Sequence, residues 1–124
     1  MNVVDSSAWL SYFAGDANSK VFAEAIENTE HLLVPSITIT EVFKIIARQS
    51  SIENALQAIA HMEQGKVIPL DQSLAVNAAK FGLEHKLPLA DSIIYATGQK
   101  YNAIIWTQDD DFKALDGVRY YSKA

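Results

Sequence analysis

The sequence predicts an α/β fold in which helices cover both faces of a central, mostly parallel sheet. Short apolar segments alternate along the chain with longer stretches of helical periodicity, and this alternation is typical of parallel sheets. The 124 residues, of which 49% are hydrophobic and 20% charged, have the size and balance of one globular domain. We therefore expect a single domain over residues 1–124, built as a three-layer sandwich.

The N-terminal part is expected to begin with two strands and three helices. An apolar strand over residues 2–4 runs into a helix that ends near Gly15. A second helix covers about residues 19–28, and residues 31–35 form a buried strand that ends at proline. A third helix extends to about Gln49.

The rest of the chain is expected to contain three more helices and three more strands. The fourth helix opens with a capping box formed by Ser50 and Glu53 and closes at Gly65. Asp71 caps a fifth helix, and a sixth begins at about Pro88, because proline suits the first helical turn. The remaining strands are expected over residues 67–70, 103–107 and 118–121.

The composition excludes several classes of protein. The chain has no cysteine, so a disulfide framework, a thiolate nucleophile and a cysteine-based zinc site are all excluded. No apolar run approaches the roughly 18 residues of a membrane span, and the first residues lack the features of a secretion signal. We expect a cytoplasmic protein without membrane contact.

The net charge of −5 has two interpretations. It argues against a nucleic-acid partner, because proteins that bind phosphates usually carry a basic surface. Alternatively, several acids are clustered to hold cations, and without four such carboxylates the rest of the chain carries only −1. Composition leaves both interpretations open.

Four acidic residues stand where an α/β fold can form a site. Asp5 follows the first strand and Asp109 follows the strand that ends at Thr107, whereas Glu41 and Asp91 lie in early turns of two helices. Ligands of open α/β sheets bind outside the carboxyl ends of the strands. We expect Asp5 and Asp109 at that edge, together with Glu41 and Asp91 if their helices start there.

Each of these acids also fits the role of a helix cap. Asp5 and Asp109 are good N-caps, residues 38–41 match a capping box, and Asp91 suits the positive end of a helix dipole. The periodicity of the third helix weakens this alternative for Glu41, which lies within a second apolar surface of that helix. A partly buried acid needs a partner, which a metal ion or a Lys or Arg can supply.

Four parts of the sequence match, in order and over nearly the whole chain, the motifs of one enzyme family. They are Val4-Asp5-Ser6-Ser7, Val34-Pro35-Ser36 with Thr40-Glu41-Val42, Leu87-Pro88-Leu89-Ala90-Asp91-Ser92, and Thr107-Gln108-Asp109-Asp110-Asp111-Phe112. On these segments the chain resembles PIN-domain ribonucleases, and in particular VapC-type toxins of VapBC toxin–antitoxin pairs. The resemblance implies a PIN-like fold and hydrolysis of phosphodiester bonds in RNA.

The resemblance also implies roles for particular residues. The catalytic residues and metal ligands would be Asp5, Glu41, Asp91 and Asp109, and the supporting residues would be Ser7, Thr107 and Asp111. Local hydrogen bonds to the backbone explain the two hydroxyls equally well. Carboxylate oxygens are hard ligands, which suit Mg²⁺ or Mn²⁺ better than zinc. Such an ion neutralises charge on the scissile phosphate and activates water.

Two cations share a helix face with one of the acids. Glu41, Lys44 and Arg48 are spaced i, i+3 and i+7, which places them on one side of the third helix. Lys44 and Arg48 would then contact RNA phosphates beside the cleavage point. The alternative is that Lys44 pairs with Glu41 and Arg48 is only solvated.

The expected partners follow from the resemblance. It implies an RNA substrate, a cognate antitoxin protein and a homodimer. Three aromatic residues close behind Asp5 are candidates for an exposed groove that receives the antitoxin, although core packing is expected for at least one of them: Trp9, Tyr12 and Phe13.

Two other functions remain alternatives. One is a PIN-like module that binds a partner without catalysis. The other is a receiver-like signalling domain with an acidic site, which fits poorly because Asp5 is followed by Ser6 and Ser7 rather than by a second acid.

Overall fold

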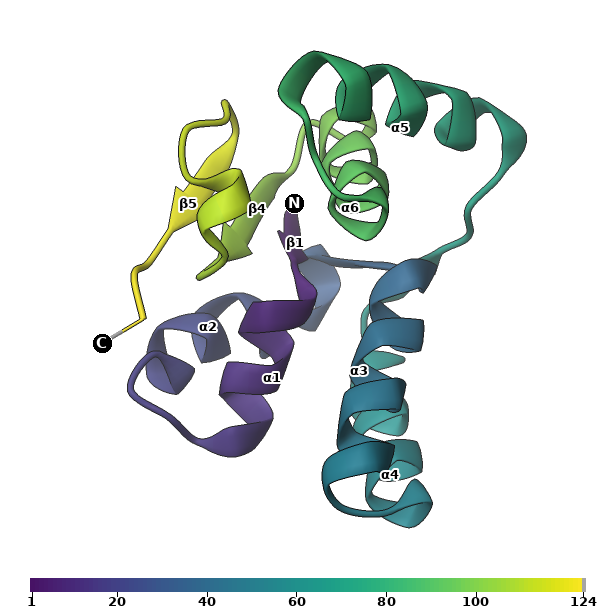
Figure 1. Cartoon of the computed structure of the whole chain (residues 1–124). Coiled ribbons are helices and arrows are strands. Elements are labelled where there is room, and N and C mark those ends of the chain that lie inside the picture. Colours follow the sequence, from purple (N-terminus) through teal and green to yellow (C-terminus); the bar gives the residue numbers. More distant parts are fainter. Residues whose placement is uncertain (124) are drawn as a thin grey trace.

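The computed structural model describes residues 1–123 and confirms the predicted α/β fold (Figure 1). Within these residues a parallel five-stranded sheet has the strand order β3-β2-β1-β4-β5. The strands are β1 (Asn2–Val4), β2 (Leu32–Pro35), β3 (Lys66–Ile68), β4 (Ile104–Thr107) and β5 (Val118–Tyr120). The helices are α1 (Ser6–Ala14), α2 (Ser19–Ile26), α3 (Ser36–Gln49), α4 (Ile52–Met62), α5 (Gln72–His85) and α6 (Leu89–Lys100), with 3-10 turns η1 (Thr29–His31) and η2 (Asp110–Phe112).

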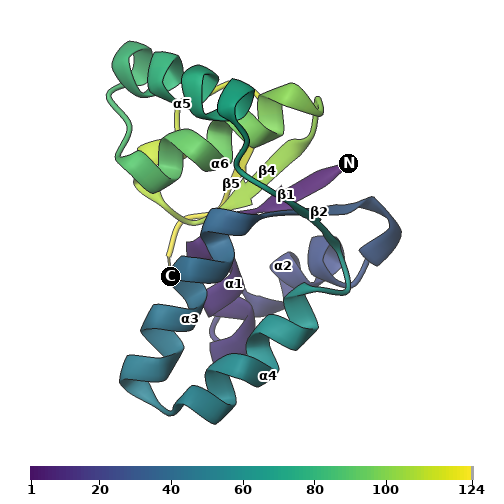
Figure 2. The same ribbon diagram turned by 90° about the vertical axis from the view of Figure 1, so that its right-hand side faces the viewer.

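Helices cover both faces of the sheet, as the predicted three-layer sandwich requires. Successive side chains of a strand point to opposite faces, so Val3 packs in a core cluster with α5 and α6, and Val4 packs in another cluster with α1 to α4. Ile105 and Trp106 of β4 divide between the same two clusters. Figure 2 shows the strands between the pair α5 and α6 and the other four helices.

Several element boundaries differ from the prediction. The cap of α4 is Ser51, whose Oγ accepts a hydrogen bond from the Asn54 N–H, so the capping box predicted at Ser50 is wrong. The helix α2 ends at Ile26, two residues before the predicted end, and β3 ends before Pro69, which has no N–H to donate to a neighbouring strand.

The alternative of a capping box at Glu41 is also wrong. The helix α3 begins at Ser36, so Thr38 already lies inside it and donates a hydrogen bond to the Pro35 carbonyl. Glu41 is therefore in the second turn, where a side chain no longer caps the helix N-terminus.

The strand order creates a crevice between β1 and β4. After β1 the chain adds β2 and β3 on one side, and it later returns to place β4 and β5 on the other side. The connections leave β1 and β4 in opposite directions, and ligands of α/β proteins bind at the carboxyl edge of such a switch point. Asp5 and residues 107–109 follow these two strands.

No helix within residues 1–123 has the length and apolarity needed to cross a membrane.

Candidate metal centre

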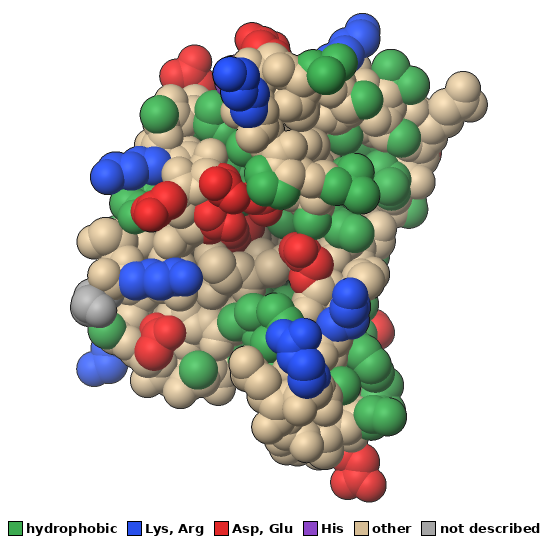
Figure 3. Space-filling view, viewed as in Figure 1, with side chains coloured by type: hydrophobic (Ala, Val, Ile, Leu, Met, Phe, Trp, Pro, Cys, Tyr) green, Lys and Arg blue, Asp and Glu red, His purple; other side chains and the backbone are tan. Residues whose placement is uncertain are grey.

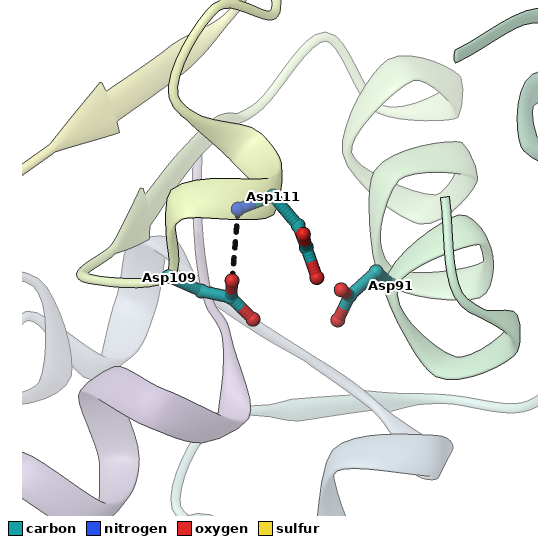
Figure 4. A group of neighbouring side chains, drawn as sticks. All are labelled: Asp91, Asp109 and Asp111. Carbon is teal, nitrogen blue, oxygen red and sulfur yellow. Dashed lines mark hydrogen bonds between the residues drawn. The ribbon is translucent and has the colours of Figure 1, made fainter. Parts of the chain in front are cut away.

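Three carboxylates lie together at the carboxyl edge of the sheet (Figure 4). Asp91 comes from the first turn of α6, Asp109 caps η2, and Asp111 lies inside that turn. Each offers one oxygen that lies within 4.8 Å of the oxygens of the other two. The Asp111 N–H donates a 2.9 Å hydrogen bond to Asp109 Oδ1, which holds the short turn in place. This cluster has the donor set of a site for a hard divalent cation.

Asp5 is both a helix cap and a buried member of the crevice. Its side chain is only 2% exposed. Its Oδ1 accepts hydrogen bonds from the Ala8 N–H at 3.0 Å and from Ser7 Oγ at 2.8 Å, and its Oδ2 accepts one from Thr107 Oγ1 at 2.8 Å. Burial raises the pKa of Asp5 to about 6, although these hydrogen bonds lower it, and the charge of Asp109 raises it further.

The negative charges of the cluster are not balanced within residues 1–123. The pKa of Asp91 rises to about 8, first because the carboxyl is partly buried and next because of the charge of Asp109 and a side-chain hydrogen bond to Asp111. The charge of Asp5 raises it further. No Lys or Arg in this part of the chain forms an ion pair with these acids. A divalent cation would replace the missing positive charge.

Thr107 joins the two strand ends through its hydroxyl. Its side chain is fully buried, donates to Asp5 Oδ2, and accepts a 2.9 Å hydrogen bond from the Asp109 N–H. Ser7 has a similar position, because its Oγ donates to Asp5 and accepts from the Gln108 N–H at 3.3 Å. Both hydroxyls thus connect parts of the site that are far apart in sequence.

Glu41 lies outside the group of three carboxylates. It is partly buried on α3, and its Oε1 accepts a 2.5 Å hydrogen bond from Ser6 Oγ at the start of α1. No ion pair joins it to Lys44 in the described chain, and Lys44 and Arg48 are exposed. The structure therefore brings Glu41 to the residue after Asp5, and its two neighbouring cations remain free of acidic partners among residues 1–123. Figure 3 shows acidic side chains in the middle of one face, with Lys and Arg side chains both beside them and at its edges.

Sequence reasoning gave Asp111 a smaller role than its position supports. Asp111 was expected as an accessory residue, yet its carboxylate lies with Asp91 and Asp109. Of the three aromatic residues close behind Asp5, Trp9 is the one in the core, where it is fully buried between the sheet and the helices around it, whereas Tyr12 and Phe13 are partly buried.

Thr107→Val is expected to weaken metal binding without unfolding the protein. Valine keeps the shape but removes the donor to Asp5 and the acceptor of the Asp109 N–H, and loss of such supporting contacts typically costs ~10–100-fold in metal affinity. We expect a destabilisation of about 1–3 kcal/mol from the unpaired buried groups. Calorimetric titration with Mn²⁺ measures the affinity.

Thr97→Val is the matched control for this variant. Thr97 is also fully buried, but its Oγ1 donates only to the Ile93 carbonyl in its own helix. The control should bind Mn²⁺ as the parent does. Equal Mn²⁺ affinities of the Thr107→Val variant and the parent would contradict the supporting role of the Thr107 hydroxyl.

Comparisons with known proteins add to this picture. A family model described as PIN domain matches residues 3–118. A structure titled "Toxin-antitoxin complex from Klebsiella pneumoniae" is similar with a TM-score of 0.83 and 23% identity, over 99% of this chain and 100% of that chain. Mycobacterium tuberculosis VapC20, titled a Sarcin-Ricin loop cleaving toxin, is similar with a TM-score of 0.78 and 19% identity, over 94% of this chain and 95% of that chain. DNA-bound VapBC from Salmonella typhimurium is also similar, with a TM-score of 0.75 and 15% identity, over 98% of this chain and 96% of that chain. No curated protein sequence matches significantly.

Proposed function

Because the chain belongs to the PIN domain family, we propose that it is a metal-dependent endoribonuclease and the toxin of a toxin–antitoxin pair. The observation that carries the proposal is the cluster of Asp91, Asp109 and Asp111 beside the buried Asp5, without a balancing cation in the described chain. Similar structures support the toxin assignment, since they include a toxin–antitoxin complex and a Sarcin-Ricin loop cleaving toxin.

The residues present fit a Mg²⁺ or Mn²⁺ ion. Asp91, Asp109 and Asp111 would hold it together with Asp5, and Glu41, which Ser6 holds at the start of α1, is the remaining candidate ligand. A bound ion supplies positive charge for the scissile phosphate and lowers the pKa of water. Asp91 or Asp109, whichever keeps an oxygen free of the ion, would orient or deprotonate the attacking water.

The direct test is incubation of the purified protein with total RNA. We expect cleavage in Mg²⁺ or Mn²⁺ and none in the presence of a chelator. A preparation that is folded and metal-loaded but cleaves no RNA would contradict the enzymatic proposal and favour a non-catalytic module that binds a partner.

We also propose that a small antitoxin inhibits the chain and that two copies form a dimer. Expression of the chain alone should stop growth, and expression together with its cognate antitoxin should restore it. Size-exclusion chromatography with light scattering tests the dimer. A monomer whose activity no co-expressed partner inhibits would contradict both parts.

Lys44→Ala combined with Arg48→Ala is expected to weaken RNA binding in a salt-dependent manner. Both side chains are exposed on the α3 face that carries Glu41, and we propose that they contact phosphates beside the cleavage point. Each lost phosphate contact should flatten the dependence of log affinity on log salt concentration by roughly 0.7 for a single strand. Mn²⁺ affinity should stay near that of the parent.

Lys20→Ala combined with Lys80→Ala is the control for this measurement. Both lysines are exposed on other helices and form no ion pair within residues 1–123. Fluorescence anisotropy with single-stranded RNA at several salt concentrations gives the slopes. An unchanged slope for the Lys44 and Arg48 variant would mean that these cations are only solvated.

A further inference from the structure

A cleft of about 750 Å³ adjoins the candidate metal centre. It lies between α1, α3 and α4, and it is separate from the three clustered carboxylates. Ser7 lines its inner end, and the same Ser7 hydroxyl donates to Asp5. Gln108 and Lys123 line both this cleft and a smaller hollow that Asp109 also borders. An RNA strand that passes over the acidic residues can therefore continue directly into the cleft.

The residues that line the cleft on α3 and α1 follow residues of the acidic site at intervals of one helical turn. On α3, Ile45 and Gln49 follow Glu41 at i+4 and i+8, so they lie on the same side of the helix. At 1.5 Å of rise per residue, Gln49 is about 12 Å farther along the helix axis than Glu41. On α1, Ser11 follows Ser7 at i+4. The cleft is thus continuous with the acidic site and extends beyond a single phosphate group.

The far end of the cleft carries neutral hydrogen-bonding groups. Gln49 from α3 and Gln57 from α4 are exposed, and their side chains form no hydrogen bond within residues 1–123. Asn54 uses its Nδ2 to donate to Ser50 Oγ, which leaves its Oδ1 available. Each amide offers both donor and acceptor atoms, as the edge of a nucleobase does.

Flat side chains stand beside these amides. Phe13 and His61 line the cleft, and their rings meet edge to face with centroids 5.7 Å apart. Aromatic side chains provide surfaces on which unpaired bases stack. Among residues 1–123, the charged side chains on the lining are Asp16, which accepts a hydrogen bond from Ser11, and Lys123. The lining also includes apolar side chains, namely Leu10, Phe13, Ala14, Ile45, Ile46 and Ala58, so an apolar helix of a protein partner is the competing occupant that the test below must distinguish.

Resting on the proposed ribonuclease function, we infer that this cleft recognises bases of single-stranded RNA next to the cleaved bond. Gln49 and Gln57 hydrogen-bond to base edges, and Phe13 and His61 provide the stacking surface. Sequence preference in cleavage then comes from α3 and α4, whereas the acidic residues act on the phosphate of any nucleotide.

The test compares the bases around the cut sites of the parent and of a double variant. A single-stranded RNA library with a randomised central stretch is cut in Mn²⁺, and the new ends are sequenced. Gln49→Met combined with Gln57→Met keeps the side-chain length but removes the amides. We expect the base preference near the cut to fall at least about fivefold at one position or more, with an unchanged Mn²⁺ affinity. The control, Gln64→Met combined with Gln72→Met, replaces exposed amides outside the cleft and should keep the parent's preference.

Several outcomes would overturn the inference. They are a parent without base preference, variants that cut the same sites as the parent, or variants that lose cleavage equally at all sites. Variants that keep the site preference but escape inhibition by a co-expressed antitoxin would make the cleft a protein-docking site instead. A folded, Mn²⁺-loaded parent that cuts nothing would overturn the proposed function, and this inference with it.

Discussion

Asp91→Asn will remove RNA cleavage while making the metal-free protein more stable. The carboxylate lies within 4.8 Å of those of Asp109 and Asp111, and its pKa of about 8 reflects burial and their negative charges. Asparagine keeps the size but loses the charge that attracts the cation and the oxygen that accepts a proton. We expect cleavage to fall by about 10²–10⁴-fold. Metal-free stability should rise by about 1 kcal/mol, a modest gain because Asp91 is partly exposed.

The matched control is Asp116→Asn. Asp116 is an exposed acid of the same C-terminal region, and only its backbone carbonyl is used, as an acceptor for Tyr95 and Gln99. Its variant should cleave RNA as the parent does. Cleavage rates with total RNA and urea unfolding without metal supply the two readouts. Equal cleavage by the Asp91→Asn variant and the parent, at matched purity, would contradict the assignment of the site.

The metal-free protein will lose stability as the pH rises from 5 to 9. Asp5 and Asp91 have pKa values of about 6 and about 8 in the folded protein, compared with 3.8 for an ordinary aspartate. The folded state therefore binds more protons than the unfolded state between pH 3.8 and about 8, so the stability conferred by these protons is lost as the pH rises through the two folded pKa values. We expect a loss of about 2 kcal/mol between pH 5 and pH 9, after allowance for the partial exposure of Asp91.

Divalent ions will reverse this loss. They bind the deprotonated carboxylates, so at pH 8 a concentration of Mn²⁺ 100 times the Kd should add about 2.7 kcal/mol. For a chain of this size that corresponds to a rise in Tm of about 10 °C. The Asp91→Asn variant should lose most of both the pH dependence and the rise in Tm. If Mn²⁺ raises Tm no more than NaCl of equal ionic strength, the acids are separate caps and not a metal site.

The order and type of the elements could be predicted because their signals are local. A strand is an apolar run of a few residues, and a helix is a periodic stretch with a cap at one end, so both can be recognised without knowing the rest of the molecule. Boundaries were less certain where neighbouring residues offer the same chemistry. Ser50 and Ser51 are both good caps, and only the path of the chain into α4 selects Ser51.

Part of the site was also accessible from sequence. Asp5 and Asp109 follow strands, and the carboxyl ends of parallel strands share one edge of a sheet, so their proximity was expected before the strand order was known. The participation of Asp111 was not accessible in this way. It depends on the 3-10 turn η2, which directs the carboxylates of Asp109 and Asp111 toward the same point near Asp91.

The sequence by itself determined the helices, the strands and the acids that follow them, because each is defined by residues within a few positions of one another. The tertiary structure decided which distant residues meet. The pairing of β1 with β4 brings Thr107 to Asp5, and the packing of α1, α3 and α4 encloses the cleft that carries Gln49 and Gln57. Such contacts depend on strand order and helix packing, which are properties of the whole chain. No local pattern of residues determines how close two residues that are distant in sequence will lie.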